Sequence, residues 1–282
     1  MADALQLVKV LHLNAIVDGK QGTIDHFRDL FGAELHSELP VIDEVEASLM
    51  TIGGTLFEWF APVAVSERGQ GRLLGMYGDH YLGIEYQVPD VSDARDVTQA
   101  LGVRILRDDG PVFFTHPRDC FGVSWEIFDR DFFEPHDDQP PTLTKTRTDE
   151  YWRTEHPLHI TGLARWSAAV HDLEAATGFY EDFLGEAVQY REARPNAVAQ
   201  ATGLAAGDTV MELISPTGDG PVQRYLDRYD QHIRSVTFSV QSLDRVEAYF
   251  DERGVALVDG DAPGTRAIPP EQNHGLLFEF TE

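Results

Sequence analysis

Cysteine and basic residues are both scarce in this chain of 282 residues. The single cysteine, Cys120, excludes an intramolecular disulfide and is typical of a protein kept in a reducing cytoplasm. Lysine and arginine number 22 against 48 aspartates and glutamates. The resulting net charge of −26 disfavours binding to nucleic acid or to anionic membrane surfaces.

Long hydrophobic runs and familiar ligand-binding motifs are also missing. No apolar stretch approaches the roughly 20 residues that span a bilayer, and the first residues lack the pattern of a signal peptide. The chain has neither a glycine-rich phosphate-binding loop nor a cysteine-pair zinc motif. We therefore expect a cytoplasmic protein with a small-molecule substrate and no nucleic-acid or membrane partner. A homodimer stays open as an alternative.

What the chain does contain is an internal repeat with a nearly constant offset. His12 lies 153 positions before Arg165, and Glu126 lies 153 positions before Glu279. Further pairs keep the offset within 152 to 154 positions: Gly32 with Gly185, Glu58 with Glu212, Val88 with Val240, and Gly102 with Gly254. The pattern predicts two copies of one unit.

Each copy divides again into two similar modules. Alternating apolar residues predict a strand over residues 11–17, and apolar residues at three- and four-residue steps predict a helix over 24–35. A strand over 81–88 and a helix over 91–102, which ends at a glycine, repeat this order. We predict an α+β fold of two tandem domains, in which each domain is a pair of βαβββ modules forming a curved, cleft-bearing mixed sheet.

Composition suggests where the two domains meet. Residues 133–157 are polar and contain a Pro-Pro pair, which is typical of a linker. We therefore place the N-terminal domain at 1–132 and the C-terminal domain at 158–282.

Alternation along the strands also selects the side chains that face the cleft. His12 and Asn14 lie on the polar face of their strand. Glu58 and Glu126 each stand between two large apolar residues, where a carboxylate is costly unless it is paired or metal-bound. These four residues are therefore candidates for a binding site.

Modules of this kind, with a histidine on the first strand and a glutamate on the last, resemble the vicinal oxygen chelate superfamily. Its members include glyoxalase I, methylmalonyl-CoA epimerase, extradiol dioxygenases and fosfomycin-resistance proteins. Residues 116–128, HPRDCFGVSWEIF, resemble the closing motif of the epimerases. The resemblance implies one divalent metal ion (Fe, Mn, Co, Ni or Zn) with His12 and Glu126 among its ligands.

The match leaves the rest of the ligand set open. The family's second histidine would fall at Gly83, so the remaining metal-ligand candidates are His80, Glu58 and Glu85. Asn14 and Glu85 are also expected to contact substrate.

The resemblance also implies a carboxylate that moves a proton in the epimerases. It falls in the region of Glu44 and Glu46, which we take as the candidate catalytic residues.

The second copy departs further from the family pattern. Arg165 stands where His12 stands in the first copy, and Ser235 stands in place of Gly83. Two carboxylates with an arginine and a serine make a poor metal site. We therefore predict a metal-free second domain that serves in scaffolding, dimerisation or closure over the first site.

Three functions follow from the resemblance. The first is a metal-dependent isomerase, epimerase or lyase that stabilises an enolate of a small oxygen-chelating substrate. The second is an extradiol-type dioxygenase using Fe(II), which the two-domain size supports, although the C-terminal copy that is active in many such enzymes lacks the histidines here. The third is a non-catalytic binding protein of the bleomycin-resistance type. We take the first as the working prediction.

Overall fold

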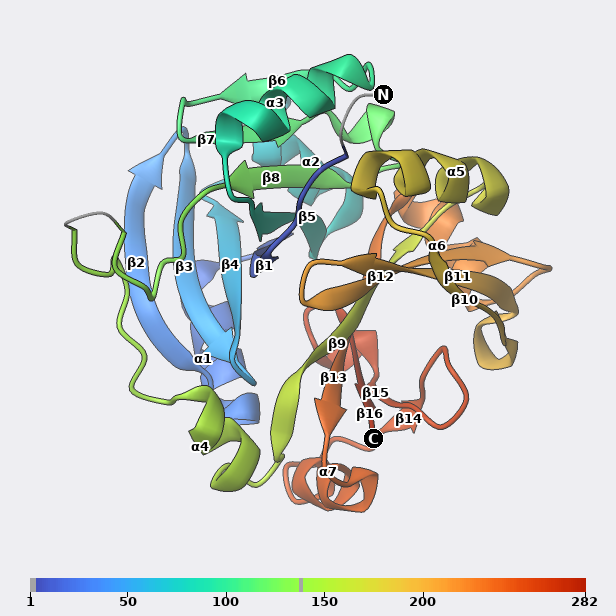
Figure 1. Ribbon diagram of the computed structural model, residues 1–282. Coiled ribbons are helices and arrows are strands. Elements are labelled where there is room, and N and C mark those ends of the chain that lie inside the picture. Colours follow the sequence, from blue (N-terminus) through green and yellow to red (C-terminus); the bar gives the residue numbers. More distant parts are fainter. Residues whose placement is uncertain (1–3, 137–138) are drawn as a thin grey trace.

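A computed structural model describes residues 4–136 and 139–282 of the chain. Two eight-stranded sheets dominate it, and in Figure 1 the N-terminal sheet is coloured blue to green and the C-terminal sheet yellow to red. The order of the first sheet is β2-β3-β4-β1-β5-β8-β7-β6. Its strands are β1 (Lys9–Ile16), β2 (Glu34–Ile42), β3 (Val45–Ile52), β4 (Thr55–Pro62), β5 (His80–Gln87), β6 (Ile105–Asp108), β7 (Val112–Thr115) and β8 (Ser124–Phe128).

The second sheet repeats the first in its order, β10-β11-β12-β9-β13-β16-β15-β14. Its strands are β9 (Ile160–Ala169), β10 (Val188–Arg194), β11 (Ala199–Ala206), β12 (Thr209–Pro216), β13 (His232–Val240), β14 (Val258–Asp259), β15 (Arg266–Ile268) and β16 (Leu277–Thr281). The predicted α+β fold, with two tandem domains of paired βαβββ modules, is therefore confirmed.

Helices connect the strands in both domains. They are α1 (Lys20–Phe31), α2 (Gly69–Tyr77), α3 (Val91–Ala100), α4 (Asp149–Thr154), α5 (Leu173–Leu184), α6 (Pro221–Tyr229) and α7 (Leu243–Asp251), with the 3-10 turns η1 (Pro117–Asp119), η2 (Pro195–Ala197) and η3 (Pro270–Gln272). Of these, α1, α2 and α3 of the first domain match α5, α6 and α7 of the second. None of the helices in the described ranges is long and apolar enough to cross a membrane.

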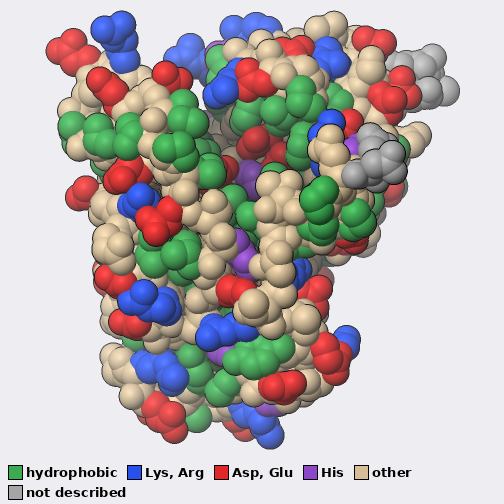
Figure 2. Space-filling view, turned by 90° about the vertical axis from the view of Figure 1, so that its left-hand side faces the viewer, with side chains coloured by type: hydrophobic (Ala, Val, Ile, Leu, Met, Phe, Trp, Pro, Cys, Tyr) green, Lys and Arg blue, Asp and Glu red, His purple; other side chains and the backbone are tan. Residues whose placement is uncertain are grey.

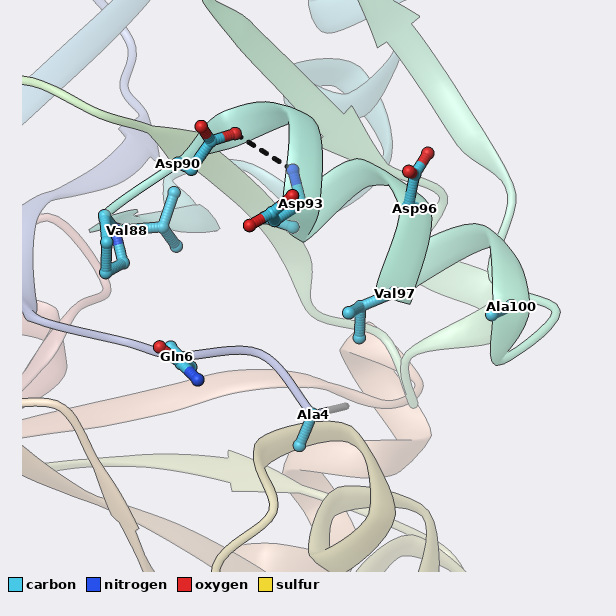
Figure 3. A pocket seen from close by; sticks show the side chains of 10 residues that line it. Ala4, Gln6, Val88, Asp90, Asp93, Asp96, Val97 and Ala100 are labelled. Atoms are coloured by element: carbon cyan, nitrogen blue, oxygen red, sulfur yellow. Dashed lines mark hydrogen bonds between the residues drawn. The ribbon is translucent and has the colours of Figure 1, made fainter. Parts of the chain in front are cut away.

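Local sequence signals explain where these helices begin and end. The α1 and α5 helices end at Gly32 and Gly185, whose φ angles of 63° and 68° suit a residue without Cβ. The side chain of Asp90 accepts hydrogen bonds from the backbone N–H groups of Ser92 and Asp93 and so caps α3 (Figure 3). The two glycines of the repeat are thus conformational requirements of the module.

Within each sheet the two modules meet side by side. In the first domain β1 pairs parallel with β4 and antiparallel with β5, and β5 pairs parallel with β8. The four central strands are therefore the first and last strands of both modules. Side chains that point to the same side from these strands converge on one cleft.

The opposite face of each sheet packs into a core that both domains share. Phe27 on α1 stacks on Trp59 of its own sheet at 4.3 Å between ring centroids and lies 5.9 Å from Phe278 of the other sheet. On the other side, the indole N–H of Trp125 donates to the hydroxyl of Tyr180 on α5 at 3.3 Å. The first helix of each domain is thus inserted between the two sheets.

The segment that joins the domains has more structure than its polarity predicts. It contains α4, and Trp152 on that helix is fully buried. The described part of the segment crosses in front of β2 and β3 in Figure 1 before it reaches β9. The boundaries at 132 and 158 stay predictions, but the segment between them contributes to the core.

Acidic residues outnumber basic ones on the surface as they do in the composition. Figure 2 shows the face on the β2 side, where acidic side chains are widely spread and histidine side chains appear in the hollow that runs down its middle. The general surface therefore carries the negative charge, which makes any local concentration of basic side chains informative.

Candidate metal centre

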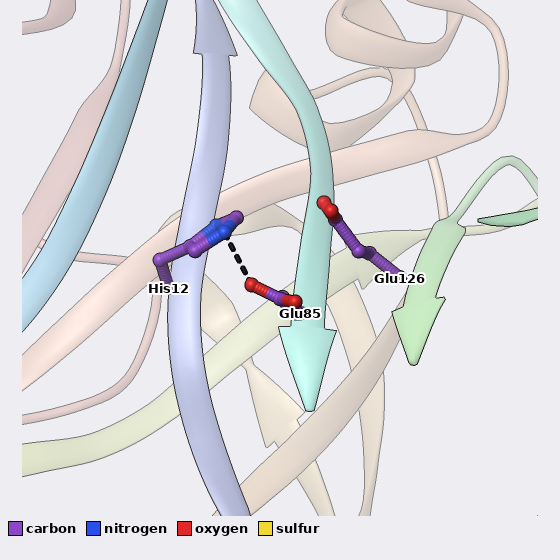
Figure 4. A group of neighbouring side chains, drawn as sticks. All are labelled: His12, Glu85 and Glu126. Carbon is purple, nitrogen blue, oxygen red and sulfur yellow. Dashed lines mark ion pairs between the residues drawn. The ribbon is translucent and has the colours of Figure 1, made fainter. Parts of the chain in front are cut away.

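Three neighbouring strands bring one imidazole and two carboxylates together. His12 on β1 lies opposite Glu85 on β5, and Glu85 lies opposite Glu126 on β8. One ligand-type atom from each side chain lies within 4.8 Å of the other two (Figure 4). This separation allows a single cation to contact all three side chains.

Two further side chains complete the group. The His12 Nε2 atom forms an ion pair with the carboxylate of Glu85 and lies 3.8 Å from Oε2 of Glu58. The amide of Asn14 donates to Oε2 of Glu126 at 2.9 Å. Asn14 therefore orients Glu126, whereas the sequence predicted for it a role in substrate contact.

Burial makes the ionised forms of Glu58, Glu85 and Glu126 less favourable and so raises their pKa values. It raises the pKa of Glu126 to about 8, with a further contribution from Glu85, while His12 and the Asn14 amide act against it. Burial raises the pKa of Glu58 to about 7, with His12 lowering it and the other two glutamates raising it. The pKa of Glu85 is raised well above its ordinary value by burial. A buried group with this much negative charge favours the uptake of a positive charge.

The residues present fit a divalent metal ion. No lysine or arginine forms an ion pair with Glu58, Glu85 or Glu126 in the part of the chain that the structure describes, where His12 is paired with Glu58 and Glu85. The Nδ1 atom of His12 and the Oδ1 atom of Asn14 are buried without a hydrogen-bond partner. Imidazole and carboxylate are ligands for Mn²⁺, Fe²⁺, Co²⁺, Ni²⁺ and Zn²⁺.

Aromatic residues from the segment after β8 form a roof over this cleft. The ring of Phe132 stacks on His12 at 5.7 Å between centroids. Phe133 packs against a small apolar cluster in which Leu143 meets Leu49 and Leu56 of the sheet. The sequence analysis missed these residues, although two adjacent phenylalanines in a polar segment are a signal that the segment is anchored.

The structure does not bring His80 into this group, so its predicted role as a ligand has no support in this geometry. It lies at the start of β5, where Nδ1 donates to the carbonyl oxygen of Gly78 at 2.7 Å. Its ring packs beside Tyr77 and Tyr229, and His232 of the second domain lies 5.5 Å away. Glu85, another of the predicted ligand candidates, lies across from His12, whereas Gly83 lies across from Asn14.

Glu44 and Glu46 also lie away from the cluster, and their predicted catalytic role has no support in this geometry. Glu44 occupies the exposed turn between β2 and β3 with a φ of 66°. Glu46 forms an ion pair with Lys20, the first residue of α1, at 3.1 Å. Because it shares strand parity with the core residue Met50, it points to the helix side of the sheet.

The equivalent cleft in the second domain contains arginine side chains that pair with its carboxylates. Strand register places Arg165, Ser167, Glu212, Thr237 and Glu279 where the first domain has His12, Asn14, Glu58, Glu85 and Glu126. Arg194, whose side chain is 3% exposed, forms an ion pair with Glu212, and the hydroxyl of Tyr190 donates to the same carboxylate at 2.8 Å.

Glu279 of the second cleft is held by hydrogen bonds rather than by a cation. Its carboxylate accepts from the hydroxyls of Ser235 and Thr237 at 3.2 and 3.1 Å and from the backbone N–H of Asp261 at 2.6 Å. Burial, with the nearby Asp261, raises the pKa of Glu279 to about 7. These contacts support the prediction of a metal-free second cleft.

Comparison with solved structures is consistent with this architecture. A mutant of 4-hydroxymandelate synthase from Streptomyces coelicolor matches with a TM-score of 0.77 and 14% identity, over 98% of this chain and 92% of that one. A fusion of a xylose isomerase-like TIM barrel with 4-hydroxyphenylpyruvate dioxygenase matches at 0.65 and 14%, over 99% and 49%. Methylmalonyl-CoA epimerase from Mycobacterium tuberculosis shows 25% identity and a TM-score of 0.41, over 43% and 87%. No curated protein matches the chain.

The fold and the site define a chain of paired βαβββ modules whose first cleft holds a buried histidine–carboxylate group. Residues 158–280 match the family model described as the Glyoxalase/Bleomycin resistance protein/Dioxygenase superfamily. The C-terminal domain therefore resembles this superfamily in sequence, and the repeated strand order of the two sheets extends the likeness in fold to the first domain. The family model covers the cleft without a metal set, whereas the candidate metal centre lies in the other domain.

Proposed function

We propose that the N-terminal cleft binds one divalent metal ion through His12, Glu85 and Glu126. We further propose that the protein is a metal-dependent isomerase, epimerase or lyase for a small substrate that offers two neighbouring oxygens. The observation that carries the proposal is the meeting of three ligand-type atoms within 4.8 Å in a buried cleft. The surplus of carboxylates, with no lysine or arginine ion-paired to them among the described residues, supports it.

The bound ion would act as a Lewis acid and lower the energy of an enolate formed from the substrate. Among the described residues of the cleft, Glu58 is the carboxylate we assign to proton transfer at the carbon next to that oxygen. Its side chain is 13% exposed, against 2% for Glu85, and its Oε2 atom lies 3.8 Å from the proposed ligand atom of His12. Asn14 acts as a positioning residue because it holds Glu126.

Phe132, in the roof of the cleft, shields the proposed metal site from water. Phe132 covers the imidazole of His12 and reduces its contact with water. Exclusion of water strengthens the interaction between a metal ion and a developing negative oxygen. We therefore assign Phe132 to closing the site over the substrate.

A dioxygenase using Fe(II) is a second candidate, favoured by the similarity in fold to 4-hydroxymandelate synthase over nearly the whole chain. The donor set argues against it. Non-haem iron oxygenases commonly use two histidines and one carboxylate, whereas this cluster offers one histidine and two carboxylates or more. Oxygen-rich sets favour harder ions such as Mn²⁺ and Lewis-acid chemistry.

Metal analysis and isotope exchange test the proposal together. Protein reconstituted separately with Mn²⁺, Fe²⁺, Co²⁺, Ni²⁺ or Zn²⁺ is dialysed and its bound metal measured by elemental analysis. We expect one ion per chain and none in a His12→Ala variant. The loaded protein is then screened in heavy water against 2-oxo and 2-hydroxy acids and acyl thioesters, with proton exchange followed by NMR.

The outcomes separate the three functions. Proton exchange that depends on Glu58 supports the enolate proposal, and oxygen consumption by the Fe²⁺ form with 2-oxo acids or catechols supports the dioxygenase. Ligand affinity that is unchanged in the His12→Ala variant supports the non-catalytic binding protein. A chain that retains none of the five metals contradicts the metal-dependent proposals.

A further inference from the structure

A hollow of about 530 Å³ lies on the side of the molecule formed by α6, the residues after η3 and the end of the α2–β5 connection. Three arginines line it, which is unusual in a chain with a net charge of −26. The lining residues that matter for its chemistry are Arg224, Arg228, Arg234, Tyr225, Tyr229 and His274. Both domains contribute to its walls, since Asp79 belongs to the first.

Two of the three guanidinium groups are available to a ligand. Arg234 is occupied, because it makes two hydrogen bonds to Asp261 at 2.6 and 2.8 Å. Arg228 lies 4.9 Å over the ring of Tyr229 and donates to a backbone carbonyl at 3.0 Å, and no ion pair with a described carboxylate is found for it. Arg224 is 66% exposed and lies 3.8 Å from the 92% exposed carboxylate of Asp219, a weak surface contact.

The acidic side chains of the hollow do little to cancel this charge. Asp79 accepts a hydrogen bond from Nδ1 of His274 at 2.7 Å and another from the backbone N–H of Asp18 at 2.7 Å. The other acidic lining residue, Glu271, is exposed to water. Solvent screens an exposed carboxylate much more than a partly buried guanidinium.

The internal repeat provides a comparison for this hollow. Gly275 approaches the backbone of Asp79 in the same way that Gly122 approaches the backbone of Gln231, so the two sides of the molecule are equivalent. Equivalent residues of the two copies lie 152 or 153 positions apart. By this offset, three basic residues of the hollow correspond to apolar residues on the other side: Arg228 to Met76, Arg234 to Leu82, and His274 to Phe121. The fold does not require these basic residues, because the equivalent side lacks them.

Another hollow on the molecule has no basic lining. The hollow of about 460 Å³ between α3 and the N-terminal segment has Asp90, Asp93 and Asp96 in its lining and no lysine or arginine (Figure 3). It follows the acidic trend of the whole chain. The arginine-lined hollow opposes that trend.

We propose that the arginine-lined hollow is a second ligand site, which binds a small oxyanion of the phosphate or carboxylate class. Arg224 and Arg228 hold the anion through charge-assisted hydrogen bonds, and the ring of Tyr229 keeps the Arg228 guanidinium in place. The site lies at the boundary between the domains, where Arg228 already bonds to Tyr77 of the first domain. It is separate from the histidine–carboxylate centre and does not depend on it.

Calorimetric titration of the metal-free full-length chain with inorganic pyrophosphate and, separately, with citrate tests the site. We expect saturable binding of one equivalent of at least one probe, weakened by added salt. The Arg224→Ala and Arg228→Met variants should each bind about tenfold more weakly, as expected for loss of a hydrogen bond to a charged group. Preference for pyrophosphate assigns the natural ligand to phosphate esters, and preference for citrate to polycarboxylates.

Two controls make the result specific. Arg72→Ala, which removes the exposed counterpart of Arg224 from the other side, should leave the affinity unchanged, and so should His12→Ala. Absence of saturable binding, or equal affinity in the wild type and the Arg224→Ala variant, overturns the proposal. Arg224 is exposed, so its variant is decisive even where Arg228→Met perturbs folding.

Discussion

The two clefts have the same strand order, but the charge of their buried carboxylates is balanced in different ways. In the second domain the protein supplies its own cation, since Arg194 lies against Glu212 in the interior of the cleft. In the first domain Glu58 and Glu126 keep the same positions, but the described residues around them include no arginine or lysine paired with them. The difference shows that retained glutamates alone do not identify a metal site.

The replacement that decides the outcome is at the position facing the first strand. The first domain has Glu85 opposite His12, and the second has Thr237 opposite Arg165. In the first domain an imidazole therefore faces a carboxylate, whereas in the second domain a guanidinium faces a hydroxyl. We therefore read the first cleft as requiring an added cation and the second as electrostatically complete.

The largest expected effect tests the claim that the second cleft supplies its own positive charge. Replacement Arg194→Met removes the close ion partner of buried Glu212 and leaves the longer contact to Arg165 at 3.9 Å. Breaking a buried pair of this kind costs about 3–5 kcal/mol of unfolding free energy. Urea denaturation followed by circular dichroism measures this loss. Arg191→Met is the control, because Arg191 is 46% exposed and its ion pair contributes less than about 1 kcal/mol. Equal effects of the two substitutions would refute the argument.

The next effect tests the claim that the first cleft needs an added cation. Replacement Glu126→Gln keeps the shape of the side chain but removes a charged ligand, and we expect metal affinity to fall by more than about 100-fold. Equilibrium dialysis with Mn²⁺ measures the change. The matched substitution Glu279→Gln in the second cleft should leave affinity within a factor of about two. A loss in the Glu279 variant instead would move the metal to the C-terminal domain.

A smaller effect is expected from the residue that orients a proposed ligand. Asn14→Ala removes the hydrogen bond of 2.9 Å to Glu126 and should weaken metal binding by about 10–100-fold, as for other groups that hold a metal ligand. The counterpart Ser167→Ala should have no effect on metal binding. If Asn14→Ala lowers unfolding free energy but not metal affinity, the side chain has a structural role alone.

The fold was predictable because the sequence carries two independent signals, an internal repeat and the periodic spacing of apolar residues. The offset between equivalent residues exposes the duplication, and alternation of apolar residues separates the two faces of each strand. Parity also placed His12, Asn14 and Glu126 on one face, as the structure finds. These inferences need only local periodicity and the repeat.

The pairing of cleft residues was not predictable in the same way. Opposition of His12 and Glu85 depends on the register of β1 against β5, which shifts between Val10 and His12 and again between Asn14 and Ala15. Such irregularities are set by tertiary packing, so counting along a strand could not decide which of His80, Glu58 and Glu85 faces His12. The position of Glu46 on the helix side was predictable, because it shares strand parity with Met50, which lies in the core.

The smallest effect compares the equivalent histidines at the domain boundary. Both ring nitrogens of His232 lie against backbone carbonyl oxygens, whereas Nε2 of His80 is buried and has no hydrogen-bond partner within the described ranges. Burial, with the nearby His232 and Arg228, lowers the pKa of His80 to about 4, against weaker raising effects of Gly78 and Asp79. Protonation is therefore costly in the folded protein.

The sign of the pH effect follows from that lowered pKa. The unfolded chain takes up a proton near pH 6.5 and the folded chain only near pH 4, so His80 stabilises the fold above pH 6.5 and the contribution is lost as the pH falls toward 4. His80→Phe should flatten this part of the stability profile by on the order of 1 kcal/mol, measured by urea denaturation at several pH values. The exposed His171→Gln variant serves as control. An unchanged slope in the His80 variant would mean that His232 and other groups dominate the acid sensitivity of the boundary.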